Sequence, residues 1–144
     1  MKKRVFALVL CMMMFLSIGA AAIYNPPDSP DASYYIAAYS ASVSNGGNGK
    51  IKVTFSITGT GIMTDLGASA IAIYKSNGTY VTTIYYFDSG RSGMMGSNKA
   101  YHSDTESIYV GAGSYYAVVT FYAGNSSGSD AQNYQTGVRT VTNP

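Results

Sequence analysis

The chain has little of the chemistry that most enzymes and metal proteins use. Among its 144 residues it contains no tryptophan, one cysteine, one histidine and only 11% charged residues. The single cysteine, Cys11, lies in the apolar N-terminal segment, so the remainder of the chain can form no disulfide. The single histidine, His102, has no partner cysteines or histidines with which to bind zinc. The sequence therefore argues against cysteine nucleophiles and zinc chemistry.

The N-terminus has the three parts of a secretory signal peptide. Residues 1–4 are basic, residues 5–18 are almost entirely apolar, and residues 19–22 are small. The apolar run is shorter than the roughly 20 residues that a membrane span needs, and prolines follow at once. We therefore interpret residues 1–22 as a cleaved signal peptide in preference to the alternative, a membrane anchor. A lipoprotein signal is also excluded, because Leu10 precedes the cysteine where a small residue is required.

Export changes what the composition implies. Loss of Lys2, Lys3 and Arg4 takes the formal net charge from +2 to −1 and leaves no basic patch. The sequence therefore predicts no nucleic-acid partner, and no membrane association after cleavage. Residues 23–32 form a predicted Pro-rich tether. Residues 33–144 form one predicted domain, large enough to bury its own core. We expect the protein to be secreted, and either released or held non-covalently at the cell surface.

Period-two alternation of apolar residues is the main structural signal after residue 33. It is clearest over 50–58, where the residues expected to face the core are Ile51, Val53, Phe55 and Ile57, and those expected to face water are Lys50, Lys52, Thr54, Ser56 and Thr58. Further strands are predicted over 33–44, 68–75, 80–87, 99–103, 107–110, 115–123 and 134–141, with loops at 59–67 and 88–98. Asn77-Gly78 predicts a type I′ hairpin turn that places Tyr74 opposite Val81. The pattern predicts an all-β sandwich of seven to eight antiparallel strands.

One stretch resembles a known family. Gly111-Ala-Gly113-Ser-Tyr115-Tyr-Ala117 is similar to the tyrosine corner of immunoglobulin-like domains, with Gly111 in place of an acidic residue and Ala117 in place of a cysteine. Residues 123–128 are similar to the end of the same strand in fibronectin type III domains. The resemblance implies a sandwich in which the Tyr115 hydroxyl bonds upstream backbone. It implies no activity. The whole chain also resembles short secreted proteins of unknown function from Gram-positive gut bacteria.

The remaining catalytic candidates are weak. His102 lies near Asp104 and Glu106, but no nucleophile and third orienting group accompany it. Asp104 and Glu106 share a face of their predicted strand, at a spacing of roughly 6–7 Å that a glycosidase would use. We interpret both carboxylates as part of an exposed, solubilising edge. Residues 88–90 and 125–130 lack the acidic density of a calcium loop. We therefore predict no enzyme, no metal and no cofactor.

Tyrosine is the unusual component, with 14 residues in the chain. Pairing of strand 68–75 with the central strand 115–123 places four tyrosines on one outward face: Tyr74, Tyr85, Tyr116 and Tyr122. We expect them to form one continuous platform for an unknown protein or glycan ligand. The predicted function is a non-enzymatic binding or adhesion module at the bacterial surface. The alternatives are a carbohydrate-binding module and a structural surface subunit that assembles with itself.

Overall fold

The computed structural model describes residues 33–144, which fold into seven antiparallel strands and one short 3-10 helix. The elements are β1 (Ile36–Gly47), β2 (Lys50–Lys75), β3 (Tyr80–Tyr85), η1 (Ser92–Met94), β4 (Met95–Tyr109), β5 (Gly113–Asn125), β6 (Gly128–Gln135) and β7 (Arg139–Val141). The predicted all-β fold is confirmed. The predicted signal peptide, 1–22, and tether, 23–32, lie outside the described residues. Within the described part, no helix has the length and apolar character needed to cross a bilayer.

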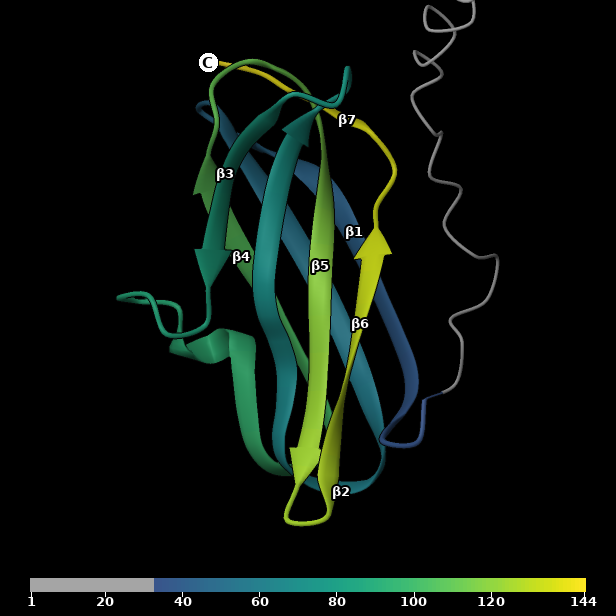
Figure 1. The fold of residues 1–144 in the computed structure, drawn as a ribbon. Coiled ribbons are helices and arrows are strands. Elements are labelled where there is room, and N and C mark those ends of the chain that lie inside the picture. The colour runs from purple at the N-terminus through teal and green to yellow at the C-terminus, as the bar shows by residue number, and fades with distance from the viewer. Residues whose placement is uncertain (1–32) are drawn as a thin grey trace, which may run out of the picture.

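Strand β2 organises the sandwich because it belongs to both layers. Its first half pairs with β1, its second half pairs with β3 and β5, and β4 pairs with it from Lys50 as far as Gly67. Strands β6 and β7 pair with successive parts of β5 and complete the second layer. Figure 1 shows this second layer in front, with β1 and β4 behind it. Ring contacts across the interior join the layers: Phe121 of β5 lies 5.0 Å from Tyr39 of β1 and 6.1 Å from Phe55 of β2, between ring centroids.

The buried residues are the ones that the predicted register of β2 places inward. The four residues expected to face inward in the first half of β2 are at most 1% exposed: Ile51, Val53, Phe55 and Ile57. Alternate residues of β5 are also buried, from Tyr115 through Val119 to Ala123. A one-residue slip of β2 would bury Lys52, so the alternation itself specifies the pairing.

The predicted loop at 59–67 is wrong, because β2 continues through it. The strand changes layer there, at an irregularity in its pairing with β4 between Thr58 and Met63. Met63 and Leu66 are buried within this continuous strand. The glycines at 59 and 61 interrupt the apolar alternation, and this interruption is the signal that suggested a loop.

The two strands predicted over 99–103 and 107–110 are one strand, β4, which also includes the last four residues, 95–98, of the predicted 88–98 loop. The error has a physical cause. The acidic residues between the two apolar stretches indicated a break, but the backbone stays paired with β2 through Asp104, Thr105 and Glu106. Pairing therefore outweighs the low strand propensity of acidic residues.

The turn between β2 and β3 is also not the predicted type I′. Gly78 has a φ of 88°, whereas Asn77 is not in the left-handed region. The Gly78 amide donates to the carbonyl of Lys75 at 2.8 Å, so Ser76 and Asn77 are the central turn residues. This arrangement is a turn followed by a glycine bulge. The bulge places Tyr74 opposite Tyr80 instead of Val81. A second register shift, between Ile73 and Tyr74, restores the predicted pairs Ile73 with Thr82 and Ile71 with Ile84.

The corner before β5 is held by a tyrosine hydroxyl, as the sequence predicts. The Tyr115 hydroxyl donates to the carbonyl of Val110 at 2.8 Å, with a longer contact of 3.4 Å to the carbonyl of Ala112. Tyr115 is only 3% exposed, so its ring is part of the core. Gly111 and Gly113 supply the positive φ angles, 83° and 152°, that the corner requires.

We expect Tyr115→Phe to lower the free energy of unfolding by about 1 kcal/mol, the usual net contribution of one hydrogen bond. The substitution keeps the buried ring and removes only the hydroxyl, so the fold should persist. Denaturant titration followed by circular dichroism measures the difference. A midpoint equal to that of the unaltered protein would show that the hydroxyl does not stabilise the corner.

Candidate functional site

The outer face of the second layer carries an aromatic cluster at one end. Tyr74 of β2 lies directly opposite Tyr116 of β5, and their rings stack with centroids 5.3 Å apart and an interplanar angle of 12°. Tyr80 of β3 packs edge-on against Tyr74, with centroids 5.7 Å apart. The structure therefore brings together two of the four tyrosines that the sequence singles out. Tyr80 joins them because of the bulge beside Gly78, which the sequence analysis missed.

The other two predicted residues lie further along the same face. Tyr85 pairs with Ala70, four residues from Tyr74 and therefore about 13 Å away along the strand. Its ring stacks on Phe87, with centroids 5.1 Å apart and an angle of 8°. Tyr122 lies opposite Gly67, beyond a bulge in β2. The predicted single platform is therefore replaced by two aromatic groups at opposite ends. We call the whole set the tyrosine face: Tyr74, Tyr80, Tyr85, Phe87, Tyr116 and Tyr122.

Small and uncharged side chains form the floor between the two groups. The cross-strand rows are Thr83, Ala72, Val118 and Gln135, followed by Tyr85, Ala70, Thr120 and Asn133. The β2 residues in these rows, Ala70 and Ala72, have small side chains, so the aromatic rings of the two groups extend further from the sheet than the residues between them. At the Tyr122 end the surface contains a hollow of about 340 Å³ lined by Asp65, Ser69, Tyr86, Met95 and Tyr122. The tyrosine face thus carries an aromatic group near each end, with small or uncharged side chains between them and one hollow at the Tyr122 end.

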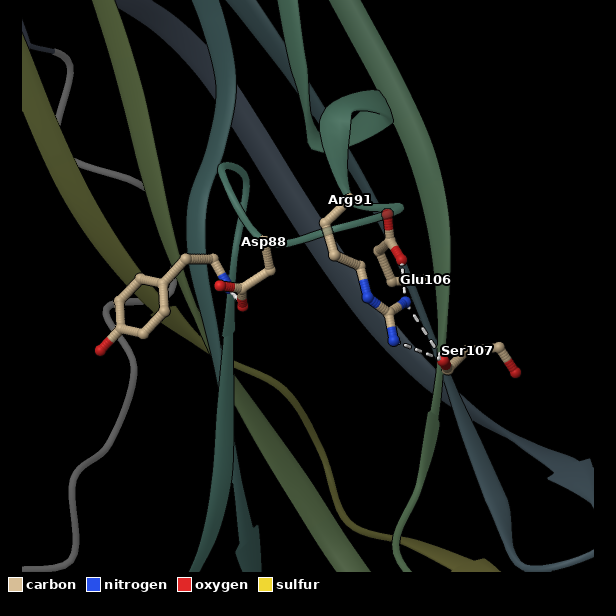
Figure 2. A network of polar contacts seen from close by, with 5 residues as sticks. Asp88, Arg91, Glu106 and Ser107 are labelled. Carbon is tan, nitrogen blue, oxygen red and sulfur yellow. Dashed lines mark hydrogen bonds and ion pairs between the residues drawn. The ribbon is translucent and has the colours of Figure 1, made fainter.

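The carboxylates of β4 do not form the exposed edge that the sequence suggests. The Glu106 side chain faces inward and is 8% exposed. It forms an ion pair with Arg91. Figure 2 shows this pair, together with the bonds from Arg91 Nη1 and Nη2 to the carbonyl of Ser107, each 3.2 Å. Asp88 fixes the segment that carries Arg91, since its Oδ2 accepts a 2.8 Å bond from the Tyr85 amide. Arg91 was not predicted as a partner, because it is distant from Glu106 in sequence.

The side chain of His102 on β4 also contacts the η1 segment. Its Nε2 lies 2.7 Å from the carbonyl of Gly93 in η1, and its ring lies 6.2 Å from that of Phe55. A side chain at Gly93 would meet Asp104, because a Cβ there would lie 2.8 Å from Asp104 Oδ2. The inward polar residues of β4 therefore hold the η1 segment against the sheet. Among residues 33–144, no group of three His, Cys, Asp or Glu side chains is placed to hold a metal ion.

Burial raises the pKa of Glu106 above its ordinary value of 4.5, and the nearby Asp104 acts in the same direction. The hydrogen bond and positive charge of Arg91 oppose this change. The folded protein therefore holds a proton on Glu106 at pH values where the unfolded chain has lost it. This contribution to stability is complete below pH 4.5 and disappears as the pH rises through the raised pKa.

We expect Glu106→Gln to remove this pH dependence. The free energy of unfolding of the unaltered protein should fall, relative to that of the variant, as the pH rises from 4.5 through the raised pKa. Denaturant titrations at a series of pH values measure the difference. The companion variant Arg91→Ala leaves Glu106 buried without its partner and should lose about 2 kcal/mol at pH 7. Parallel pH profiles for the protein and Glu106→Gln would contradict the assignment.

Comparison with known proteins identifies no family. No family model matches the chain, and no curated protein sequence matches it. Among solved structures, the chain is similar to the crystal structure of the C-terminal domain of wzt, with a TM-score of 0.48 and 16% sequence identity. The similarity covers 74% of this chain and 72% of that one.

Proposed function

We propose that this protein is an extracellular, non-enzymatic binding module whose ligand lies along the tyrosine face. The observation that carries this proposal is the pair of aromatic groups separated by about 13 Å of uncharged floor. Tyr85 is 42% exposed, Tyr80 58% and Phe87 70%. Aromatic residues gathered on one exposed face in this way are the anchors that interfaces prefer.

The shape of the face favours an extended ligand. A compact ligand would engage one aromatic group, whereas a chain lying parallel to the strands reaches both. Tyrosine side chains have few rotatable bonds, and the stacked rings of Tyr74 and Tyr116 restrict each other further, so binding costs little side-chain entropy. The floor supplies polar atoms without charge, from Thr83, Asn133 and Gln135.

The second candidate is a carbohydrate-binding module, and the composition of the floor favours it. Sugar rings present apolar faces to aromatic side chains and hydroxyl groups to amides and hydroxyls. The tyrosine face offers both kinds of partner, with aromatic rings at its ends and hydroxyl and amide groups between them. Adhesion through a protein ligand uses the same anchors, so the two candidates share one surface and differ in the ligand.

Two finer proposals concern the kind of domain and its location. The hydroxyl bond of Tyr115 supports an immunoglobulin-like or fibronectin III-like sandwich, because that bond closes the corner in such domains. Secretion rests on the basic, apolar and small segments of residues 1–22. We place the protein outside the cell of a Gram-positive bacterium, free or held non-covalently at the surface.

The test is a pull-down with the purified protein against cell-surface extract and a panel of insoluble polysaccharides. Tyr74→Ala combined with Tyr116→Ala should reduce capture of the bound partner at least about tenfold, since each anchor is worth about 1 kcal/mol or more. Tyr34→Ala is the matched control, because Tyr34 is 82% exposed and precedes β1. Unchanged capture by a folded double variant would place the site elsewhere. Light scattering distinguishes a monomeric binder from a self-assembling subunit.

A further inference from the structure

The opposite side of the sandwich carries a second surface with a different chemistry. Nine of the outward side chains of β1, the first half of β2 and β4 are serine or threonine hydroxyls. We call this surface the hydroxyl face, and its members are Ser40, Ser42, Ser44, Thr54, Ser56, Thr58, Ser103, Thr105 and Ser107. It belongs to the layer that excludes β3, β5 and β6, so it is separate from the tyrosine face.

The pairing register arranges these hydroxyls in a two-dimensional array. One row runs Ser42, Thr54, Thr105, and the next runs Ser40, Ser56, Ser103. Neighbouring strands are about 5 Å apart and successive outward residues on one strand are about 7 Å apart. The array follows directly from three strands with Ser or Thr at alternate positions.

Hydrogen bonds between strands fix the array in place. Ser40 Oγ lies 2.9 Å from Ser56 Oγ, and Thr54 Oγ1 lies 3.0 Å from Thr105 Oγ1. A hydroxyl has one hydrogen and two lone pairs, so each bonded pair keeps an unused hydrogen and most of its lone pairs. The β-branched threonines are stiff at χ1. The face therefore presents ordered donors and acceptors that need little rearrangement to bind a ligand.

The charged side chains of this layer lie around its central rows, with Lys99 two residues from Tyr101 on β4 and Arg139 lining a hollow together with Ser42. Lys50 and Lys52 point outward at the start of β2, while the carboxylates of Asp104 and Glu106 point inward. The central rows contain no charged side chain. A charged ligand over these rows would lose its hydration without gaining an opposite charge. A neutral ligand rich in hydroxyl groups loses water hydrogen bonds and regains them from the array.

An aromatic ring and a hollow mark where such a ligand would lie. Tyr101, 57% exposed, stands at the end of the array opposite Lys50 and Lys52. Beside it the surface contains a hollow of about 430 Å³, lined by Ser40, Ser42, Thr54, Ser56, Tyr101 and Ser103 together with Ala41 and Phe55. The hollow therefore combines fixed hydroxyls with one aromatic face, which are the two kinds of partner that a sugar ring uses.

We propose that the hydroxyl face is a second binding site, which takes a neutral polysaccharide chain. The chain lies over the Ser42 and Ser40 rows, exchanges hydrogen bonds with the array and stacks a sugar ring on Tyr101. This site does not depend on the tyrosine face, so either can be present without the other.

Thr54→Val combined with Thr105→Val tests the site. Both changes keep side-chain shape and strand propensity and remove two hydroxyls from the centre of the array. The assay is affinity electrophoresis of the purified protein in gels containing hydroxyethyl cellulose, galactomannan, dextran or, as the anionic arm, polygalacturonate. We expect at least one neutral polymer to retard the protein. The double variant should bind it about tenfold more weakly, corresponding to two lost hydrogen bonds.

Two controls separate this site from the tyrosine face. Thr64→Val makes the same chemical change at an exposed position of β2 outside the array, and it should migrate like the unaltered protein. Tyr74→Ala with Tyr116→Ala should also retain full retardation. Tyr101→Ala should weaken it.

The following results would overturn the proposal. The first is the absence of retardation by any neutral polymer. The second is retardation that survives loss of both threonine hydroxyls, or that is lost on removal of Tyr74 and Tyr116. The third is retardation by polygalacturonate alone, which would assign binding to Lys50 and Lys52. The fourth is a dimer, seen by sedimentation, that Thr54→Val and Thr105→Val dissociate, since the face would then be covered by a second copy.

Discussion

Val53→Asp should leave the protein unfolded in water at neutral pH. Val53 is completely buried in the first half of β2, between Val43 of β1 and Glu106 of β4. An ionised carboxylate there has no cation to pair with, because Arg91 already pairs with Glu106. Burying the charge costs several kcal/mol, and repulsion from Glu106 adds to the cost. That total is comparable with the whole stability of a domain of this size.

The neighbouring residue is the matched control for this prediction. Thr54→Asp introduces the same side chain one position along the strand, on the exposed face. It should change the midpoint of thermal unfolding by only a few degrees, as for a surface substitution. Circular dichroism melts of both variants make the comparison. A folded Val53→Asp beside an unfolded Thr54→Asp would mean that the register of β2 is wrong by one residue.

Gly67→Ala should be the most damaging change outside the apolar core. Gly67 lies where β2 passes between Met95 of β4 and Tyr122 of β5. A Cβ at this position would overlap the carbonyl oxygen of Met94 and would lie 2.8 Å from the Cα of Met95. Both contacts are with backbone, which cannot rotate away as a side chain would. The strands must separate locally, and we expect a loss of about 3 kcal/mol.

Gly61→Ala provides the control, on the same strand and in the segment that changes layer. A Cβ there meets nothing within 4 Å, and the residue does not need a positive φ. Urea titration should therefore show a stability close to that of the unaltered protein for Gly61→Ala and a strongly lowered midpoint for Gly67→Ala. Equal midpoints for the two variants would contradict the close approach of β2 and η1.

Some parts of this structure could be predicted from the sequence because one local rule decides them. Alternation of apolar and polar residues from Ile51 to Ile57 fixes which side of β2 is buried. The resemblance of residues 111–117 to a tyrosine corner likewise implies the Tyr115 hydroxyl bond. In both places the residues involved are close in sequence, and no distant partner changes the outcome.

Other parts depend on distant partners, and there the sequence misleads. Glu106 looks exposed until Arg91 is folded over it. The 59–67 segment looks like a loop until β4 pairs beside it. The four predicted tyrosines are on one face, but Tyr85 lies opposite Ala70 and Tyr122 lies opposite Gly67, both well along β2 from the stacked pair at Tyr74. The predicted hairpin register already pairs Tyr85 with Ala70, so strand spacing alone separates Tyr85 from Tyr74, whereas the bulge near Ser69 that displaces Tyr122 has a weak sequence signal.

The proposal that the tyrosine face binds the ligand is tested most directly by amide chemical-shift mapping by NMR. The purified protein is titrated with the partner that the pull-down captures. We predict that the largest shifts fall on residues of β3, β5 and the second half of β2, around Tyr74, Tyr85 and Tyr116, and that they disappear in the Tyr74→Ala, Tyr116→Ala variant. Shifts confined to the 88–94 segment, with β5 unchanged, would contradict the account.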